Sequence, residues 1–228
     1  MDITYLLKNK IIVSVQAACD EPLYEEGALL AMMKSVVNGG AQALRLAGTR
    51  DIKNAKKYFD LPIIGITKPE KLPENWLNEI YITPSVQDVE ALAEAGADII
   101  AFDATNRQRT KNSLPEIISA VKGLNKLSMA DIATFDDAKK AIELGVDIVS
   151  TTLSGYTLET ANGNDEPDFI LLQKIVENFN VPVILEGRIW EISQVKKAFE
   201  LGAFAVVIGS AITRPQLITN RFLNWRQL

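Results

Sequence analysis

Short apolar runs rich in β-branched residues alternate with amphipathic segments of helical periodicity along almost the whole chain. The runs that we predict as strands are Lys10–Gln16, Ala41–Leu46, Leu61–Lys68, Ala97–Ala104, Leu127–Asp131, Val146–Thr152, Val181–Glu186 and Ala203–Ser210. Near-continuous apolar strands separated by helices are typical of a parallel sheet. About eight strand-helix pairs in 228 residues are what a closed barrel needs. We therefore predict a (β/α)8 barrel, a TIM barrel, as one domain over residues 1–228.

Signals for the beginnings and ends of helices support this alternation. Ser85 has the position of an N-cap with Asp88 three residues later, and Gly96 follows the predicted helix Val86–Ala95. Thr134 is a similar cap, and a glycine followed by a strand recurs at roughly regular spacing, as at Gly145. An open, doubly wound sheet would show the same alternation, but no GxGxxG turn follows the first strand. A short β-like piece is also expected at 80–83, and the last helix at 215–226.

Composition excludes several classes of function. The formal net charge is -5 and the pI is about 5.0, which argues against a broad surface for nucleic acid or an anionic membrane. The chain has no histidine, so histidine-based catalysis and imidazole metal ligands are excluded. The single cysteine, Cys19, excludes an intramolecular disulfide. No long apolar run is present, and we expect a soluble, cytoplasmic protein without membrane contact.

In a barrel of this kind the functional face is built at the carboxyl ends of the strands. Polar residues end nearly every predicted strand: Gln16, Arg45, Lys68, Asp103, Asp131, Thr151 with Thr152, Glu186, and Gly209 with Ser210. The alternative is that these residues satisfy one another as a buried polar belt or cap the following helices. Their recurrence on almost every strand favours a common site.

Several segments carry a family resemblance. They are IVSVQA (12–17), EPLY (21–24), GITK (65–68), YITPS (81–85), AGADIIAFDAT (95–105), MADIAT (129–134), TTLSGYT (151–157), EGRI (186–189) and GSAITRP (209–215). In this order they resemble N-acetylmannosamine-6-phosphate 2-epimerase. The resemblance implies a (β/α)8 barrel that interconverts N-acetylmannosamine 6-phosphate and N-acetylglucosamine 6-phosphate in sialic acid catabolism. It also implies that the reaction needs neither a metal nor another cofactor.

Inversion at C2 of such a sugar requires removal of the proton next to the open-chain aldehyde. Lys68 matches the family's catalytic lysine, and burial near Arg45 would lower its pKa toward the range of a useful base. The alternative is a lysine paired with Asp103 or Asp131. Glu186 matches the family's second catalytic residue, and its alternative is a salt bridge to Arg188. The residues leave open whether one or two bases act and which proton Glu186 handles.

The remaining site residues follow from the same strand ends. Gln16, Arg45 and Asp131 are expected to bind the sugar, and Asp103 either orients Lys68 or has a structural role. Phosphate is expected between the last two strand ends, at Gly187, Arg188, Gly209 and Ser210. The only small-molecule partner expected is a sugar phosphate, and Trp225 in the predicted last helix is compatible with a homodimer.

Some positions depart from the family pattern, so the sugar is less fixed than the reaction. Leu46 and Ala47 follow Arg45 where a polar side chain is usual, and Pro69 follows Lys68 where a basic residue is usual. Two other functions remain open on these residues. Lys68 could form a Schiff base in a class I aldolase, or the protein could bind a sugar phosphate without catalysis.

Overall fold

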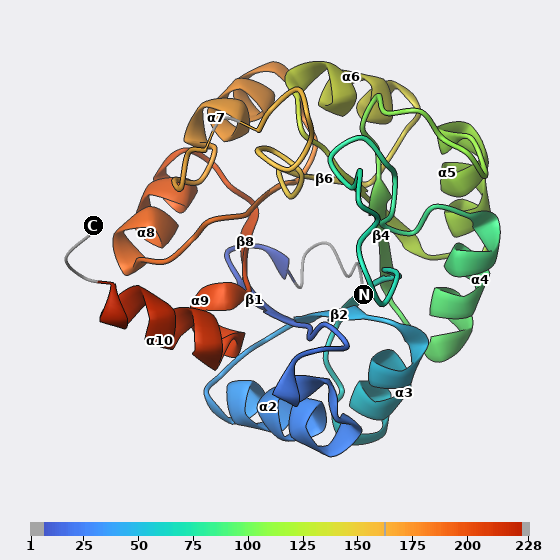
Figure 1. Cartoon of the computed structure of the whole chain (residues 1–228). Coiled ribbons are helices and arrows are strands. Elements are labelled where there is room, and N and C mark those ends of the chain that lie inside the picture. The colour runs from blue at the N-terminus through green and yellow to red at the C-terminus, as the bar shows by residue number, and fades with distance from the viewer. Residues whose placement is uncertain (1–6, 162, 225–228) are drawn as a thin grey trace.

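The computed structural model describes residues 7–161 and 163–224. Within this part of the chain, eight parallel strands pair in chain order and close into a barrel, with β1 hydrogen-bonded to both β2 and β8. Figure 1 looks along the barrel and shows the strands in the middle, surrounded by a ring of helices that runs from α2 through α4, α6 and α8 to α10. The predicted TIM barrel is confirmed, and the open sheet is excluded.

The strands are β1 (Ile11–Val15), β2 (Leu44–Ala47), β3 (Ile63–Ile66), β4 (Ile99–Asp103), β5 (Leu127–Asp131), β6 (Ile148–Ser150), β7 (Val183–Glu186) and β8 (Ala205–Ile208). The helices are η1 (Pro22–Tyr24), α2 (Glu26–Asn38), α3 (Thr49–Tyr58), α4 (Val86–Ala95), α5 (Leu114–Gly123), α6 (Phe135–Glu143), α7 (Phe169–Asn178), α8 (Ile192–Glu200), α9 (Ser210–Thr213) and α10 (Pro215–Leu223). None of the helices in the described ranges has the length and apolar character that a membrane span requires.

Local signals placed several boundaries well. The Ser85 hydroxyl accepts the Asp88 N–H, and Gly96 ends α4 with a left-handed φ of 103°. Other boundaries were wrong by a few residues. The piece at 80–83 is not a strand, because the closed barrel offers no free edge to pair with. Residues 1–6, 162 and 225–228 of the predicted single domain, including Trp225, lie outside the described residues.

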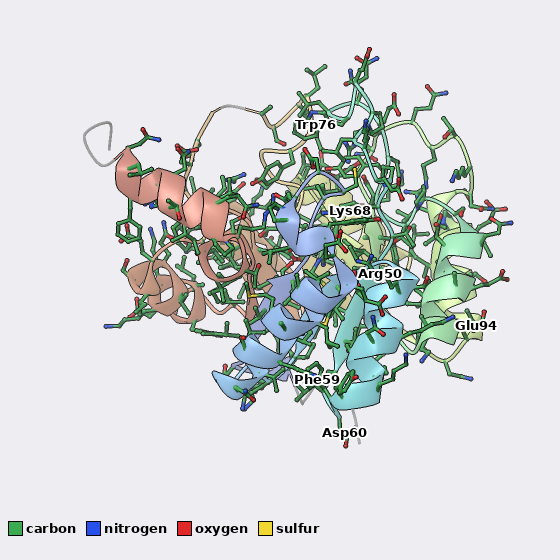
Figure 2. The ribbon with its side chains drawn as sticks, turned by 60° about the horizontal axis from the view of Figure 1, so that its bottom comes forward. Arg50, Phe59, Asp60, Lys68, Trp76 and Glu94 are labelled. Atoms are coloured by element: carbon green, nitrogen blue, oxygen red, sulfur yellow. The ribbon has the colours of Figure 1, made fainter. Side chains whose placement is uncertain are left out.

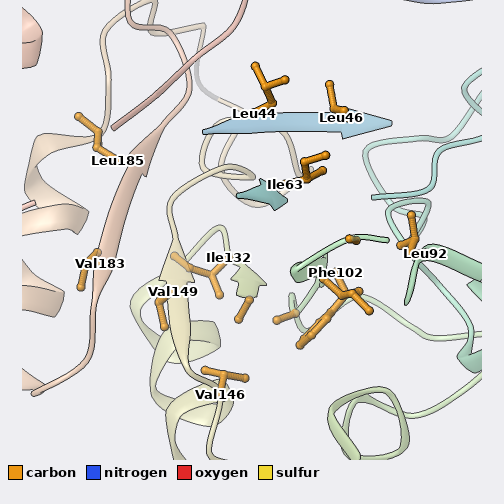
Figure 3. Packing of buried hydrophobic residues seen from close by; sticks show 14 of the residues in the cluster. Leu44, Leu46, Ile63, Leu92, Phe102, Ile132, Val146, Val149, Val183 and Leu185 are labelled. Atoms are coloured by element: carbon orange, nitrogen blue, oxygen red, sulfur yellow. The ribbon is translucent and has the colours of Figure 1, made fainter. Parts of the chain in front are cut away.

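Alternate residues of each strand face two separate cores. On the outer surface of the barrel, Leu44, Leu46, Val183 and Leu185 pack in the layer between strands and helices (Figure 3). Gly65 on β3 permits this packing, because an added Cβ would lie 2.8 Å from the Ala97 Cβ and 2.9 Å from Ile52 Cδ1. The helices can therefore approach this strand closely.

The inner core changes from apolar to polar toward the carboxyl ends of the strands. Its lower layers are apolar and include Ile12, Ile64, Ile99, Met129, Ile148 and Ile184. Two residues after Ile12, Met129, Ile148 and Ile184 come Ser14, Asp131, Ser150 and Glu186, whereas β3 and β4 stay apolar at the corresponding positions. Because side chains alternate with a period of two, these polar residues point into the barrel on the same side as the apolar ones. The upper end of the barrel interior is therefore a polar layer.

Candidate active site

A cavity of about 670 Å³ opens above this polar layer, at the carboxyl ends of the strands. Its volume lies within the usual range for sites that bind small molecules. Seven of the predicted site residues line it: Gln16, Lys68, Glu186, Gly187, Arg188, Gly209 and Ser210. Figure 2 shows Lys68 beneath the loop that carries Trp76. The structure thus brings together residues at or just after the carboxyl ends of β1, β3, β7 and β8.

The other two predicted site residues, Arg45 and Asp131, lie beneath the cavity. Arg45 is in the middle of β2 rather than at its end, and its side chain is 1 % exposed. It donates two hydrogen bonds to the Asp131 carboxylate, at 3.2 and 2.6 Å, and Asp131 is fully buried. Neither residue lines the cavity. This ion pair forms a polar floor across the barrel, and whether the pair contacts the sugar stays a prediction.

Glu186 stands on this floor. Arg45 Nη1 lies 3.2 Å from Glu186 Oε2, and the Thr152 hydroxyl contacts the same oxygen at 3.1 Å. Burial raises the pKa of Glu186, although the positive charge of Arg45 acts in the opposite direction. The predicted alternative, a salt bridge to Arg188, is not formed, because Arg188 points to backbone carbonyls instead. Burial therefore favours the protonated form of the Glu186 carboxyl, relative to a carboxyl in water.

Lys68 lies two residues beyond the end of β3, and its side chain is open to the cavity. Its Nζ donates to Gln16 Oε1 at 3.0 Å, and Gln16 Nε2 donates to Ser14 Oγ at 2.8 Å. Desolvation within the cavity, together with the charge of Arg45, lowers the pKa of Lys68 to about 8. Gln16 thus holds the amine in place, and pairing of Lys68 with Asp103 or Asp131 is not observed among the described residues.

Arg188 lies at the end of the cavity where phosphate is predicted to bind. Its hydrogen bonds go to carbonyl oxygens and not to a carboxylate. Arg188 has a left-handed φ of 58°, and its guanidinium donates to the carbonyl oxygens of Glu166, at 2.7 Å, and Ser154. Gly155 makes room for it, because an added Cβ there would clash with the guanidinium. Carbonyl oxygens orient a cation without neutralising it, so Arg188 remains available to an anion.

A second arginine at this end was not predicted. Arg214 lines the cavity together with Ser210 and ion-pairs with Glu21, while its buried Nε has no hydrogen-bond partner among the described residues. Its position after β8 depends on α9, which Thr213 fixes by donating to the Ser14 carbonyl oxygen at 2.7 Å. The available signal was a basic residue four positions after Ser210, within the segment GSAITRP.

Aromatic side chains form the opposite wall. Trp76 and Tyr81, from the loop between β3 and α4, pack edge to face with ring centroids 6.5 Å apart, and both line the cavity with Tyr156. Asp103 does not orient Lys68. Its carboxylate pairs with Arg107 and accepts from the Thr105 hydroxyl at 2.7 Å. In the described part of the chain no three side chains of metal-binding type gather at one place.

The comparisons with known proteins agree with this geometry. Residues 29–227 match the family model NanE, "Putative N-acetylmannosamine-6-phosphate epimerase". Relatives named "Putative N-acetylmannosamine-6-phosphate 2-epimerase" include one from Clostridioides difficile, which is 46 % identical over 95 % of this chain and 96 % of its own length. One from Listeria monocytogenes is 40 % identical over 96 % of this chain and 92 % of its own.

A solved structure extends the likeness to three dimensions. The N-acetylmannosamine-6-phosphate 2-epimerase of Clostridium perfringens superposes with a TM-score of 0.92 at 40 % identity, covering 99 % of this chain and 96 % of that one. The match includes the strands that carry the cavity and the loops that surround it. The chain belongs to the NanE family of N-acetylmannosamine-6-phosphate 2-epimerases.

Proposed function

We propose that the protein interconverts N-acetylmannosamine 6-phosphate and N-acetylglucosamine 6-phosphate, with Lys68 as the base that removes the C2 proton. Membership of the NanE family supports the reaction. One observation carries the assignment of the base: Lys68 lies in the cavity with its pKa lowered to about 8 and one N–H donated to Gln16. A neutral amine held in this way keeps its lone pair free to accept a proton.

Glu186 supplies the second proton-transfer group in this proposal. It is carried by β7, and Lys68 follows β3, so three strands lie between them in either direction around the barrel. The two side chains therefore enter the cavity from opposite sides. After Lys68 takes the C2 proton, the electron pair moves to the aldehyde oxygen and C2 becomes planar. The Glu186 carboxyl then protonates the opposite face of C2, which inverts its configuration. When the reaction starts from the other sugar, the two proton transfers run in reverse.

The test of this function is incubation with N-acetylmannosamine 6-phosphate in deuterated water, followed by proton NMR. We expect N-acetylglucosamine 6-phosphate to form and the C2 proton signals of both sugars to disappear as deuterium enters. If the sugar phosphate is recovered with its C2 hydrogen and configuration unchanged, the protein binds the sugar phosphate without catalysing epimerisation.

The rate should depend on pH through Lys68. Only the neutral amine can accept a proton, so its active fraction rises as the pH rises through the Lys68 pKa of about 8. For the sugar whose C2 hydrogen faces Lys68, we expect kcat/KM to increase about tenfold per pH unit below this value and to level off above it. Initial rates across this range in buffers of constant ionic strength measure the profile. A rate that is flat or falls as the pH approaches 8 from below contradicts the assignment.

The two arginines of the phosphate end should control affinity rather than chemistry. Replacing Arg188 by alanine removes a charge that meets only carbonyl oxygens, and we expect KM to rise about ten- to hundredfold with little change in kcat. Arg214→Ala should act in the same direction. Inorganic phosphate as a competitive inhibitor provides the control, since its inhibition should weaken in parallel with substrate binding. If only kcat falls and KM is unchanged, these arginines do not bind the phosphate group.

We also infer a cytoplasmic homodimer. The single Cys19 is a free thiol, which suits a reducing compartment. Ile192 is 88 % exposed and Phe222 is 76 % exposed. These residues belong to neighbouring helices, because Arg221 on α10 pairs with Glu191, the residue before α8. Exposed apolar side chains on two neighbouring helices favour a protein interface. Sedimentation analysis of the full chain tests this state, and a monomer at all concentrations would exclude it.

A further inference from the structure

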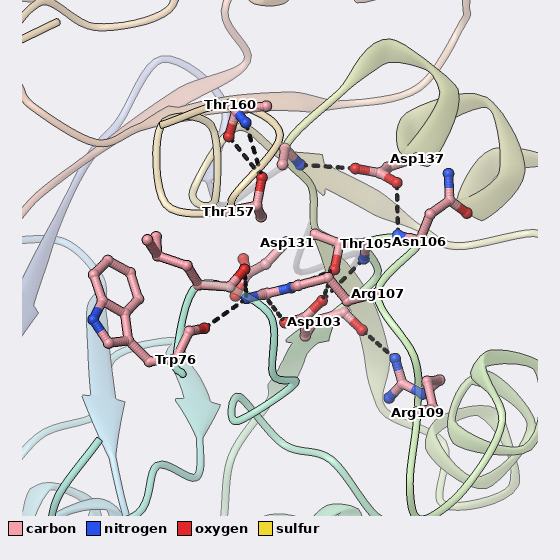
Figure 4. A network of polar contacts seen from close by, with 12 residues as sticks. Trp76, Asp103, Thr105, Asn106, Arg107, Arg109, Asp131, Asp137, Thr157 and Thr160 are labelled. Atoms are coloured by element: carbon pink, nitrogen blue, oxygen red, sulfur yellow. Dashed lines mark hydrogen bonds and ion pairs between the residues drawn. The ribbon is translucent and has the colours of Figure 1, made fainter. Parts of the chain in front are cut away.

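One guanidinium joins the end of β4 to the loop that covers the cavity. Arg107 lies in the loop after β4, and its side chain is 9 % exposed. Its Nη2 pairs with the Asp103 carboxylate, and its Nε donates to the Thr105 hydroxyl at 3.0 Å. Its Nη1 donates to the carbonyl oxygens of Trp76, at 3.0 Å, and Leu77, at 3.3 Å (Figure 4). Three nitrogens of one side chain thus serve two different loops.

The segment that Arg107 holds is part of the cavity wall. Trp76 and Tyr81 line the cavity, and the Arg107 guanidinium lies 5.8 Å from the centre of the Tyr81 ring. The Leu77 carbonyl oxygen also accepts the N–H of Leu158, at 3.1 Å. Leu158 belongs to the loop between β6 and α7 that also carries Tyr156. The contacts around Arg107 therefore connect three loops at one point.

The other end of the connection is rigid. Asp103 is the last residue of β4 and is fully buried, and its carboxylate also accepts from the Thr105 N–H at 3.0 Å. Its backbone carbonyl oxygen accepts from Arg109 at 2.7 Å. A buried ion pair adds little net stability, because desolvation of both charges offsets their attraction. The arrangement is better explained by the loop that the arginine fixes, and Arg107 itself does not line the cavity.

We propose that Arg107 is a positioning residue for the epimerisation: anchored on Asp103, it holds the loop with Trp76 and Tyr81 against the bound sugar. The catalytic part of this inference rests on the proposed function. The loop wall contacts the sugar throughout the reaction, so its loosening weakens the ground state and the transition state alike. Such a change raises KM and leaves kcat nearly unaltered.

The test is the substitution Arg107→Lys. A lysine keeps a positive charge near Asp103, but its single nitrogen cannot also replace the two nitrogens that donate to Thr105 and to two carbonyl oxygens. Arg50→Lys is the matched control. Arg50 also pairs with an acid, Asp51, at 2.9 Å, and donates to a backbone carbonyl oxygen of a separate segment, that of Tyr24 at the end of η1, at 3.0 Å, without lining the cavity.

Two measurements read the outcome. We expect amide hydrogen exchange in residues 70–80 of Arg107→Lys to become about tenfold faster, and KM to rise about tenfold with kcat within about threefold of the unaltered protein. Arg50→Lys should leave both unchanged. Amide hydrogen exchange is measured without substrate, so it tests whether Arg107 holds the loop even if the protein acts on another sugar.

The inference is overturned if loop exchange in Arg107→Lys is unchanged, or if kcat falls while KM stays constant. Should this variant not fold, the pair Asp103→Asn with Arg107→Gln removes both charges at once and avoids an unpaired buried carboxylate. It should show the same faster exchange in residues 70–80, and unchanged exchange there would overturn the inference equally.

Discussion

Replacing Lys68 by alanine is expected to stop hydrogen exchange at C2 of the sugar while the sugar phosphate still binds. The amine is the group proposed to take the C2 proton, so we expect kcat to fall by about a thousandfold or more. The protein should stay folded, because the side chain is open to the cavity and makes one hydrogen bond, to Gln16. Proton NMR in deuterated water measures the exchange, and calorimetric titration measures the binding.

A matched control separates this effect from a general loss of charge at the cavity mouth. Lys71 is an exposed lysine three residues further along the same loop, and Lys71→Ala should keep full activity. Undiminished turnover in Lys68→Ala would rule out Lys68 as the base. Borohydride trapping distinguishes the aldolase alternative, since a stable adduct between Lys68 and the sugar would require a Schiff base.

The sequence was sufficient for the fold because each element carries its own local signal. Capping residues such as Ser85 and Thr134 placed helix starts to the residue, and apolar runs located all eight strands. Strand ends were less certain, because ladder hydrogen bonds and not composition decide them. Lys68 was predicted inside a strand, yet β3 ends at Ile66.

The direction of Arg45 could not be predicted in the same way. Both faces of a barrel strand are buried, so an apolar run does not reveal which alternate residues point inward. In β2, Leu44 and Leu46 face the helices, which places Arg45 in the barrel interior, paired with Asp131. A residue interpreted as part of the rim is therefore part of the floor. Arg214 and Arg107 escaped prediction because their positions depend on loop folding.

The floor explains how two acid-base groups can differ in protonation. Arg45 is already paired through two nitrogens with Asp131, so Glu186 shares a cation whose charge is largely balanced. Burial then dominates and raises the pKa of Glu186, while the same cation helps to lower the pKa of Lys68. Burial thereby favours the protonated form of Glu186 on one side of the cavity, against the charge of Arg45, while desolvation and Arg45 together favour the neutral form of Lys68 on the other side.

Replacing Glu186 by glutamine tests this division of roles. Glutamine can still accept hydrogen bonds from Arg45 and Thr152, so the floor should remain intact, but it cannot transfer a proton. We expect conversion between the two sugars to fall by about a hundredfold or more. Deuterium should still enter C2 of one sugar, the one whose C2 hydrogen faces Lys68. Proton NMR of each sugar, incubated separately in deuterated water, gives both readouts.

Which of the two sugars exchanges its C2 hydrogen in Glu186→Gln distinguishes the mechanisms, because Lys68 and Glu186 enter the cavity from opposite sides of the barrel. If Lys68 served both faces of a rotating intermediate, Glu186→Gln would still exchange the C2 hydrogen of both sugars. If Glu186 acted in ring opening, exchange would be lost from both. Glu200→Gln, which alters an exposed carboxylate on α8, controls for the change of charge and should behave as the unaltered protein. Exchange confined to one sugar is the outcome that only two opposed groups produce.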